Sequence, residues 1–293
     1  MNVNSYYEIG HGHIVCEDYA LAEQIDDKAF IIVSDGCSQS RNTDVGARLV
    51  SIIARDTLLY LFQSDLMKRN TEVNDNFPIV FQELFLKKCL ETKAILKLST
   101  NTFDATLLLA FVLNNKLHVL CYGDGYVIYK TKDGAIIADS THYSSSAPYY
   151  LSYHMSTVKN KDYLEEFGEQ TIEGRSTDIS SDGISNTKIV MTKKIKETLS
   201  HWMSYWKIYD LSDDTIESVT LSSDGIDTYA RNLKHRGEES TLDCSAVSMI
   251  QRMIDYKNKN GEFVLRRMSR IKRDMASEHV IHDDDVSSAT IIF

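Results

Sequence analysis

Several features that mark other classes of protein are scarce in this chain of 293 residues. It holds only 2 prolines and 13 glycines, about half of average usage or less, so each glycine-containing turn carries more information than usual. No apolar run approaches the roughly 20 residues that a membrane span needs. The longest run, residues 106–113, fits a buried strand. The first residues lack the basic and apolar regions of a signal peptide, so we expect no secretion signal.

Paired cysteines are also missing. The cysteines are odd in number, scattered, and form no CxxC pair: Cys16, Cys37, Cys89, Cys121 and Cys244. We therefore expect neither a disulfide framework nor a zinc knuckle, and interpret them as thiols in a reducing cytoplasm. The formal charge of −10 argues against general nucleic-acid binding. The 43% hydrophobic and 25% charged residues are typical of a folded globular protein.

The hydrophobic pattern of the first half predicts both helices and strands. Residues 29–33 are predicted to form a buried strand that stops at a turn. A helix is expected from Thr43 or Asp44 to about Gln63, and a second one after residue 76. Beyond residue 102 the pattern predicts an antiparallel meander of four strands. These strands cover residues 104–113, 117–122, 126–130 and 135–138.

The second half is less regular. Residues 139–186 are polar and rich in serine and tyrosine, and we interpret them as a flap-like excursion from the sheet. A strand at 187–191 and a helix through Trp206 are then expected, followed by a strand at 218–221. A helix at 266–275 and a last strand at 289–293 complete the prediction. No linker divides the chain, so residues 1–293 are expected to form a single domain.

Acidic residues recur where the predicted strands end or begin. They are Glu17, Asp18, Asp35, Asp124, Asp224, Asp284 and Asp285. One Asp-Gly pair is only a turn signal, but the strands of a sheet can bring several such ends together. Clustered carboxylates repel one another unless they are protonated or bind cations. Hard divalent cations prefer such oxygen ligands, so the pattern indicates a metal site.

Six segments share an order that can be compared with known families. They are Gly10-His11-Gly12-His13 with Cys16-Glu17-Asp18, Phe30 to Gly36, Thr43 to Arg48, Tyr122 to Gly125, Leu221 to Ile226, and Asp284 to Ser287. Each segment is weak alone, but together they are fairly specific. In order and rough spacing the chain resembles the metal-dependent type 2C (PPM) protein serine/threonine phosphatases, particularly their bacterial branch.

The resemblance implies an α+β fold, a four-layer α/β/β/α sandwich with two central antiparallel sheets flanked by helices. It also implies a cleft at one end that holds two Mn²⁺ or Mg²⁺ ions. Two metals about 4 Å apart would lower the pKa of a bridging water, and the resulting hydroxide would attack phosphorus in line. Asp18 would hold metal-bound water, and Asp124 matches an aspartate linked to a third, weaker metal.

The remaining ligands also follow from the resemblance. Asp35 would bridge the two metals, with the Gly36 carbonyl as a further ligand. Asp224 and Asp284 would complete one metal, and Glu17 would serve the other. At two places more than one aspartate could match the family pattern. Among the three consecutive aspartates at 283–285, the pattern fits Asp284. The look-alike segment at 180–184 lacks a preceding strand, so its Asp182 is expected in a surface turn.

Two positions depart from the family pattern. Some members hold phosphate with an arginine before the first acidic pair, but residues 1–16 contain neither arginine nor lysine. His13 lies in that neighbourhood. It is interpreted as a hydrogen-bond donor to phosphate or a general acid, or alternatively as a structural histidine. Cys37 stands where animal members often carry a histidine. We interpret it either as a small loop residue or as an oxidation-sensitive thiol.

We therefore expect a cytoplasmic enzyme that hydrolyses phosphoserine and phosphothreonine in proteins and opposes a cognate Ser/Thr kinase. No nucleic-acid or membrane partner is expected. The missing arginine leaves a second hypothesis, a non-catalytic relative that binds a phosphoprotein or regulatory partner. Retention of the acidic positions argues against it. A calcium-binding structural protein is weaker still, because the acidic residues form no EF-hand loop.

Overall fold

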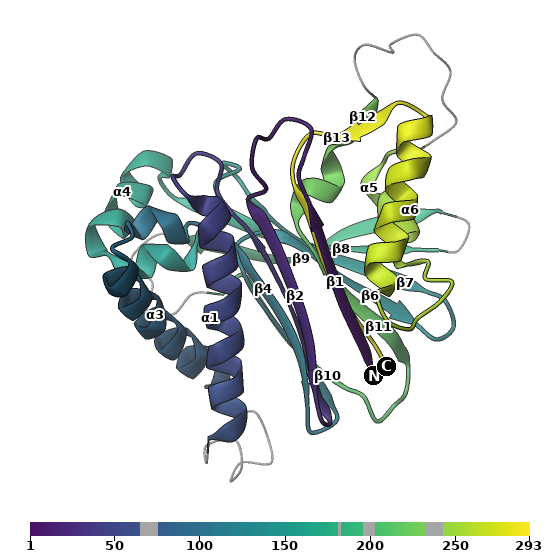
Figure 1. The fold of residues 1–293 in the computed structure, drawn as a ribbon, viewed down its shortest axis with the longest axis horizontal. Helices are drawn as coiled ribbons and strands as arrows, with labels where there is room; N and C mark the ends of the chain where they lie inside the picture. Colours follow the sequence, from purple (N-terminus) through teal and green to yellow (C-terminus); the bar gives the residue numbers. More distant parts are fainter. Residues whose placement is uncertain (65–75, 181–182, 196–202, 232–242) are drawn as a thin grey trace.

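Two antiparallel sheets form the centre of the molecule, and helices cover their outer faces (Figure 1). The computed structural model describes residues 1–64, 76–180, 183–195, 203–231 and 243–293. One sheet has five strands in the order β10 (Tyr205–Asp210), β5 (Lys116–Tyr122), β4 (Leu107–Leu113), β3 (Lys28–Asp35) and β2 (Asp18–Ile25). The other has seven, in the order β1 (Asn2–Glu8), β14 (Val286–Ile292), β11 (Ile216–Ser222), β6 (Gly125–Thr131), β7 (Ile136–Tyr143), β8 (Gln170–Ile179) and β9 (Ser185–Ile195).

The helices complete the four layers that the family resemblance implies. The helices α1 (Thr43–Gln63) and α3 (Phe77–Leu96) pack on the five-stranded sheet. The helices α5 (Ala246–Ile254) and α6 (Phe263–Ser277) pack on the other sheet. The predicted α/β/β/α sandwich is thus confirmed. No helix in the described ranges is long and apolar enough to cross a membrane.

Residues 29–33 of strand β3 are all apolar, and the packing of the strand explains why. Phe30 and Ile32 pack toward α1 and α3, whereas Ile31 and Val33 pack between the two sheets. All four side chains are fully buried. Because successive side chains of a strand point to opposite faces, a strand covered on both faces is hydrophobic at every position. This central strand carries its last residue, Asp35, to one end of the sheets.

The flap-like excursion is shorter than the sequence pattern predicts. Strand β7 continues to Tyr143, and β8 and β9 rejoin the sheet as a hairpin. Only residues 144–169 leave the sheet. They contain the 3-10 helix η2 (Leu151–Met155) and α4 (Thr157–Phe167). We call residues 144–169 the flap.

A second correction concerns the helix predicted through Trp206. Trp206 lies in β10 opposite Leu120, and its ring stacks on Phe77 at 6.0 Å. The pairing with β5 and the aromatic contact together favour a strand over local helix propensity. Trp202 and Asp182 lie outside the described residues.

The remaining short elements lie near the ends of the main strands. The 3-10 helix η1 (Thr100–Phe103) precedes β4, and η3 (Asp224–Thr228) follows β11. Strands β12 (Tyr229–Arg231) and β13 (Val280–His282) form a separate pair. Strand β13 precedes the loop that carries Asp284, and the Asp284 N–H donates to Thr228 Oγ1 of η3 (3.2 Å).

Candidate active site

The β2–β3 hairpin supplies the first two acidic residues of the site. Its register places Asp18, the first residue of β2, opposite Asp35, the last residue of β3. Thr106 fixes the end of β3, because the backbone N–H of Asp35 donates to its Oγ1 (2.9 Å) and its own N–H donates to the Asp35 carbonyl (2.8 Å). The backbone on either side of Asp35 is therefore held before any ligand arrives.

The seven-stranded sheet supplies the facing residues. Asp224 follows β11 and Asp284 precedes β14, and these two strands are neighbours. Ser223 links the sheets at this end. Its Oγ donates to Asp18 Oδ2 (2.7 Å) and accepts from the Ser287 N–H (3.0 Å).

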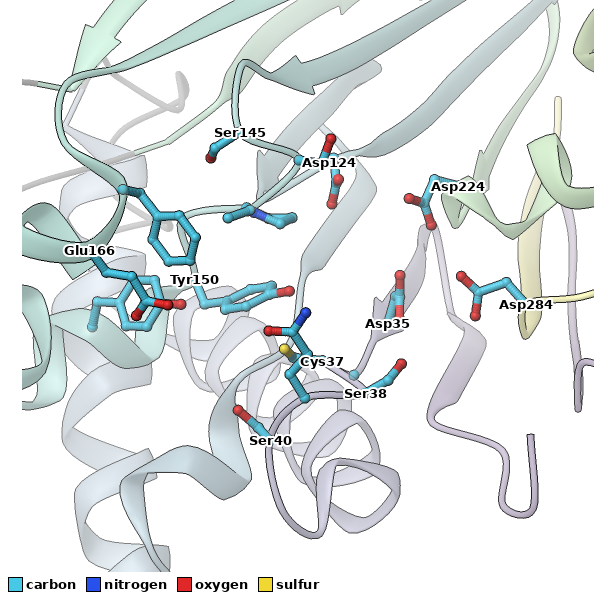
Figure 2. A pocket seen from close by; sticks show the side chains of 17 residues that line it. Asp35, Cys37, Ser38, Ser40, Asp124, Ser145, Tyr150, Glu166, Asp224 and Asp284 are labelled. Atoms are coloured by element: carbon cyan, nitrogen blue, oxygen red, sulfur yellow. The ribbon is translucent and has the colours of Figure 1, made fainter. Parts of the chain in front are cut away.

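The four aspartates Asp35, Asp124, Asp224 and Asp284 line one cleft of about 470 Å³. Figure 2 shows Asp35, Asp224 and Asp284 close together, with Asp124 on the adjoining β5–β6 turn. Gly36 also lines the cleft. A side chain there would place Cβ 2.7 Å from the Thr43 carbonyl oxygen, so the backbone needs glycine at this position.

The charges of these carboxylates act on one another. Burial, followed by the charges of Asp18, Asp224, Asp124 and Asp284, raises the pKa of Asp35 well above its usual range. Burial and the charge of Asp224 also raise the pKa of Asp124. Burial and Asp284 likewise raise the pKa of Asp224. The metal-free cleft therefore holds carboxylates whose ionised form is disfavoured, and a bound cation would reverse that penalty.

Asp18 lies behind the cleft and does not line it. Its side chain is 1% exposed, and burial raises its pKa to about 7. Hydrogen bonds from Ser223 and neighbouring groups oppose this rise, and the charge of Asp285 adds to it. Its Oδ1 is buried without a hydrogen-bond partner. A buried oxygen without a partner fits a group that accepts a proton from a water or ligand in the cleft.

The donor set fits a hard divalent cation. Carboxylate oxygens and the Gly36 carbonyl are the ligands that Mg²⁺ and Mn²⁺ prefer. Within the described ranges, no three acidic, histidine or cysteine side chains are arranged closely enough to enclose one ion. The structure thus gathers all the predicted ligands except Glu17 around one cleft, without closing them on a metal.

Glu17 is not among the residues that line the cleft. Its carboxylate accepts a hydrogen bond from Thr43 Oγ1 at the start of α1. Its carbonyl accepts from the Gly36 N–H (3.0 Å), so it is tied to the turn that follows Asp35. Its metal-binding role remains a prediction from the family resemblance.

Asp285 has a structural role that the sequence does not predict. It is 2% exposed, and its carboxylate accepts from the backbone N–H groups of Gly10 (2.6 Å) and Glu17 (2.5 Å). It therefore fastens the loop before β2 to the loop before β14. The side chain of the preceding Asp284 is 41% exposed and lines the cleft, which agrees with the predicted choice of register.

His13 lies between these two aspartates. Its Nε2 is 3.4 Å from Asp284 Oδ1, and its Nδ1 is 3.1 Å from Asp285 Oδ2. Partial burial alone would lower the pKa of His13, but the hydrogen bond and charge of Asp285, with Asp284, raise it. Because His13 does not line the cleft, these contacts favour the structural alternative. Cys37 does line the cleft, next to Gly36.

Comparisons with known proteins identify the family. The family model described as protein phosphatase 2C matches residues 9–270, a span that contains Asp35, Asp124 and Asp224 and ends before Asp284. The chain belongs to the protein phosphatase 2C family. No curated protein sequence gives a significant match.

Solved structures agree with this family. A bacterial serine phosphatase is 12% identical, with 99% of this chain and 96% of that chain covered and a TM-score of 0.53. The serine/threonine phosphatase of S. agalactiae is 12% identical, with 99% of both chains covered and a TM-score of 0.52. Stp1 from Staphylococcus aureus is 12% identical, with 100% and 95% covered and a TM-score of 0.51. At these identities the likeness establishes the fold.

Proposed function

We propose that this phosphatase-family chain removes phosphate from phosphoserine and phosphothreonine in proteins, with the help of divalent metal ions. One observation carries the proposal. Asp35, Asp224 and Asp284 come from two different sheets and line the same open cleft. Burial, together with the charges of the neighbouring aspartates, raises the pKa of Asp35, and bound cations would offset both effects.

The residues of the chain then have defined tasks. Asp35 and the Gly36 carbonyl would hold a pair of metal ions. Asp224 and Asp284 would complete the ligands of one ion and Glu17 those of the other, and Asp124 would serve a third, weaker ion. When bound, Mn²⁺ or Mg²⁺ supplies an activated water and neutralises charge on the phosphoryl group.

Asp18 lies opposite Asp35 in the β2–β3 register, and from there it would orient the attacking water and accept its proton. Ser223 fixes one of its oxygens and leaves Oδ1 available. His13 keeps the loop of Asp284 and Asp285 in place. Its second proposed role is to donate a hydrogen bond to the phosphate of the substrate.

The proposal is tested by phosphate release from 4-nitrophenyl phosphate and from a phosphothreonine peptide. Wild type is compared with Asp224→Asn and His13→Ala, with and without Mn²⁺, and Mn²⁺ binding is measured separately by calorimetry. We expect turnover that needs the metal and is lost in Asp224→Asn. A folded, Mn²⁺-loaded wild type without turnover would refute the proposal and favour the non-catalytic, phosphoprotein-binding alternative. Equal kcat and KM in His13→Ala would remove His13 from the phosphate site.

We also propose a cytoplasmic setting in which the enzyme opposes a Ser/Thr kinase. The five cysteines, all in the described part of the chain, form no disulfide, which suits a reducing compartment. Phosphoproteomics of cells that lack the protein tests this proposal. An increase in phosphoserine or phosphothreonine at defined sites is expected, and an unchanged phosphoproteome would contradict it.

A further inference from the structure

We propose that Glu166 makes the cleft selective for phosphorylated residues that have a basic residue, preferably arginine, nearby in the substrate. This inference rests on the proposed phosphatase function and specifies its substrate class. It concerns the wall of the cleft that the flap forms, away from the aspartates that would hold metal.

The cleft continues from the aspartates to the flap. Its lining includes residues 145–148 together with Tyr150, Tyr153, Glu166 and Phe167. Figure 2 shows Glu166 and Tyr150 on the side of the cleft opposite Asp224 and Asp284. A peptide whose phosphorylated residue reaches Asp35 and whose chain follows the flap side of the cleft would bring a flanking residue to Glu166.

The charged residues that line the cleft are all acidic. None of the residues that line the cleft is lysine or arginine. Lys159 of α4 does not compensate, because its ammonium donates to the buried Asp104 and lies 5.1 Å from the centre of the Tyr153 ring. Glu166 has no ion pair or hydrogen bond with any described residue. A cationic group of the substrate would be its first counter-ion.

The neighbouring glutamate of the same helix is arranged differently. Glu165 pairs with Lys161 at 3.1 Å, an (i, i+4) contact on the surface of α4. It does not line the cleft. The two adjacent glutamates thus provide a matched pair, one facing the cleft and one already neutralised outside it.

The aromatic rings beside Glu166 favour arginine over lysine. Tyr150 and Phe167 are flap residues that line the same cleft as Glu166. A guanidinium group can stack on an aromatic face while it forms two parallel hydrogen bonds to a carboxylate. An ammonium group provides only the point charge. Because Glu166 is exposed, the expected selectivity is about three- to tenfold in kcat/KM.

The test is a series of phosphothreonine peptides in which one arginine is moved along both flanks of an alanine background. Wild type is expected to prefer arginine at one or two positions by about three- to tenfold, and the preference should fall as salt is added. Glu166→Gln should abolish the preference, and Glu166→Lys should favour peptides with glutamate there. Glu165→Gln should keep the wild-type pattern. Hydrolysis of 4-nitrophenyl phosphate should be unchanged in all three variants, since this substrate has no flanking residues.

The outcomes separate this inference from the proposed function. An active wild type with no positional preference would overturn the role of Glu166 alone. A preference that survives in Glu166→Gln, or disappears equally in Glu165→Gln, would overturn it as well. A metal-loaded wild type that hydrolyses neither the peptides nor 4-nitrophenyl phosphate would overturn both the phosphatase proposal and this one.

Discussion

Replacing Asp18 by asparagine is expected to stabilise the metal-free protein near neutral pH and to abolish its phosphatase activity. Asp18 is fully buried, and burial raises its pKa from the ordinary value of 3.8 to about 7. In the unfolded chain the same carboxylate ionises freely in water. Folding at pH 8 therefore carries the cost of an ionised carboxylate that water no longer solvates.

The size and sign of this cost follow from the two pKa values. Below pH 3.8 Asp18 is protonated in both states, and its ionisation costs nothing. Between pH 3.8 and about 7 only the folded state keeps the proton, so the free energy of unfolding falls as pH rises. Above pH 7 the loss is complete, at ~4 kcal/mol from this group alone. Asparagine carries no charge and can still accept the hydrogen bond from Ser223, so it should avoid this loss.

The assay is urea unfolding in the presence of EDTA from pH 4 to pH 8, for wild type, Asp18→Asn and the exposed-site control Asp213→Asn. The curves of wild type and Asp18→Asn should diverge as pH rises, whereas the control should follow wild type. With Mn²⁺ present, kcat of Asp18→Asn should fall by about a hundredfold or more, since proton transfer is lost. Parallel stability curves for wild type and Asp18→Asn would refute the reasoning.

Two further variants test the loops around the site. Gly225→Ala would place its Cβ 1.8 Å from the Asp285 carbonyl oxygen, so we expect a loss of about 3 kcal/mol in urea unfolding. An unchanged midpoint would contradict this close approach. His282→Gln changes a side chain whose Nδ1 is 2.8 Å from the Asp284 carbonyl oxygen and whose Nε2 is 3.1 Å from Glu8 Oε1. Because such outer contacts orient metal ligands, calorimetry should show about ten- to a hundredfold weaker Mn²⁺ binding. Wild-type affinity would show that His282 does not position Asp284.

Strong local patterns made part of the fold predictable. Helix α1 covers Thr43–Gln63, close to the bounds that the apolar spacing and the possible capping residues Thr43 and Asp44 predict. The β4–β5 hairpin turns at Asn114-Asn115, both with positive φ, between the strands predicted at 104–113 and 117–122. In these segments the residue types that favour the local structure also satisfy the packing, so the two levels agree.

The edges of the sheets were not predictable in the same way. Strand β9 is exposed over most of its length because it is the last strand of its sheet. The strand predicted at 187–191 nevertheless lies within β9. The strand that the prediction misses is β8, which falls inside the polar stretch interpreted as an excursion. The helix predicted through Trp206 failed because pairing with β5 is a long-range contact that no local pattern encodes.

The acidic site also combines features that the local sequence predicts with features that depend on long-range contacts. The positions of Asp35 and Asp224 after apolar strands were visible in the sequence, but the approach of Asp18 to Ser223 joins residues 205 positions apart. The difference between Asp284 and Asp285 depends on which way two consecutive side chains point. One lines the cleft and the other accepts hydrogen bonds from backbone N–H groups. Composition alone cannot separate them.

The most direct test of the central claim is the metal-dependent turnover of wild type beside Asp35→Asn. Asp35 joins the cleft to the core strand β3, and both ions of the proposed metal pair would depend on it. We predict that Mn²⁺-loaded wild type hydrolyses a phosphothreonine peptide, and that Asp35→Asn, folded to the same extent, loses about a hundredfold or more of kcat/KM. Equal turnover in the two proteins would contradict the account.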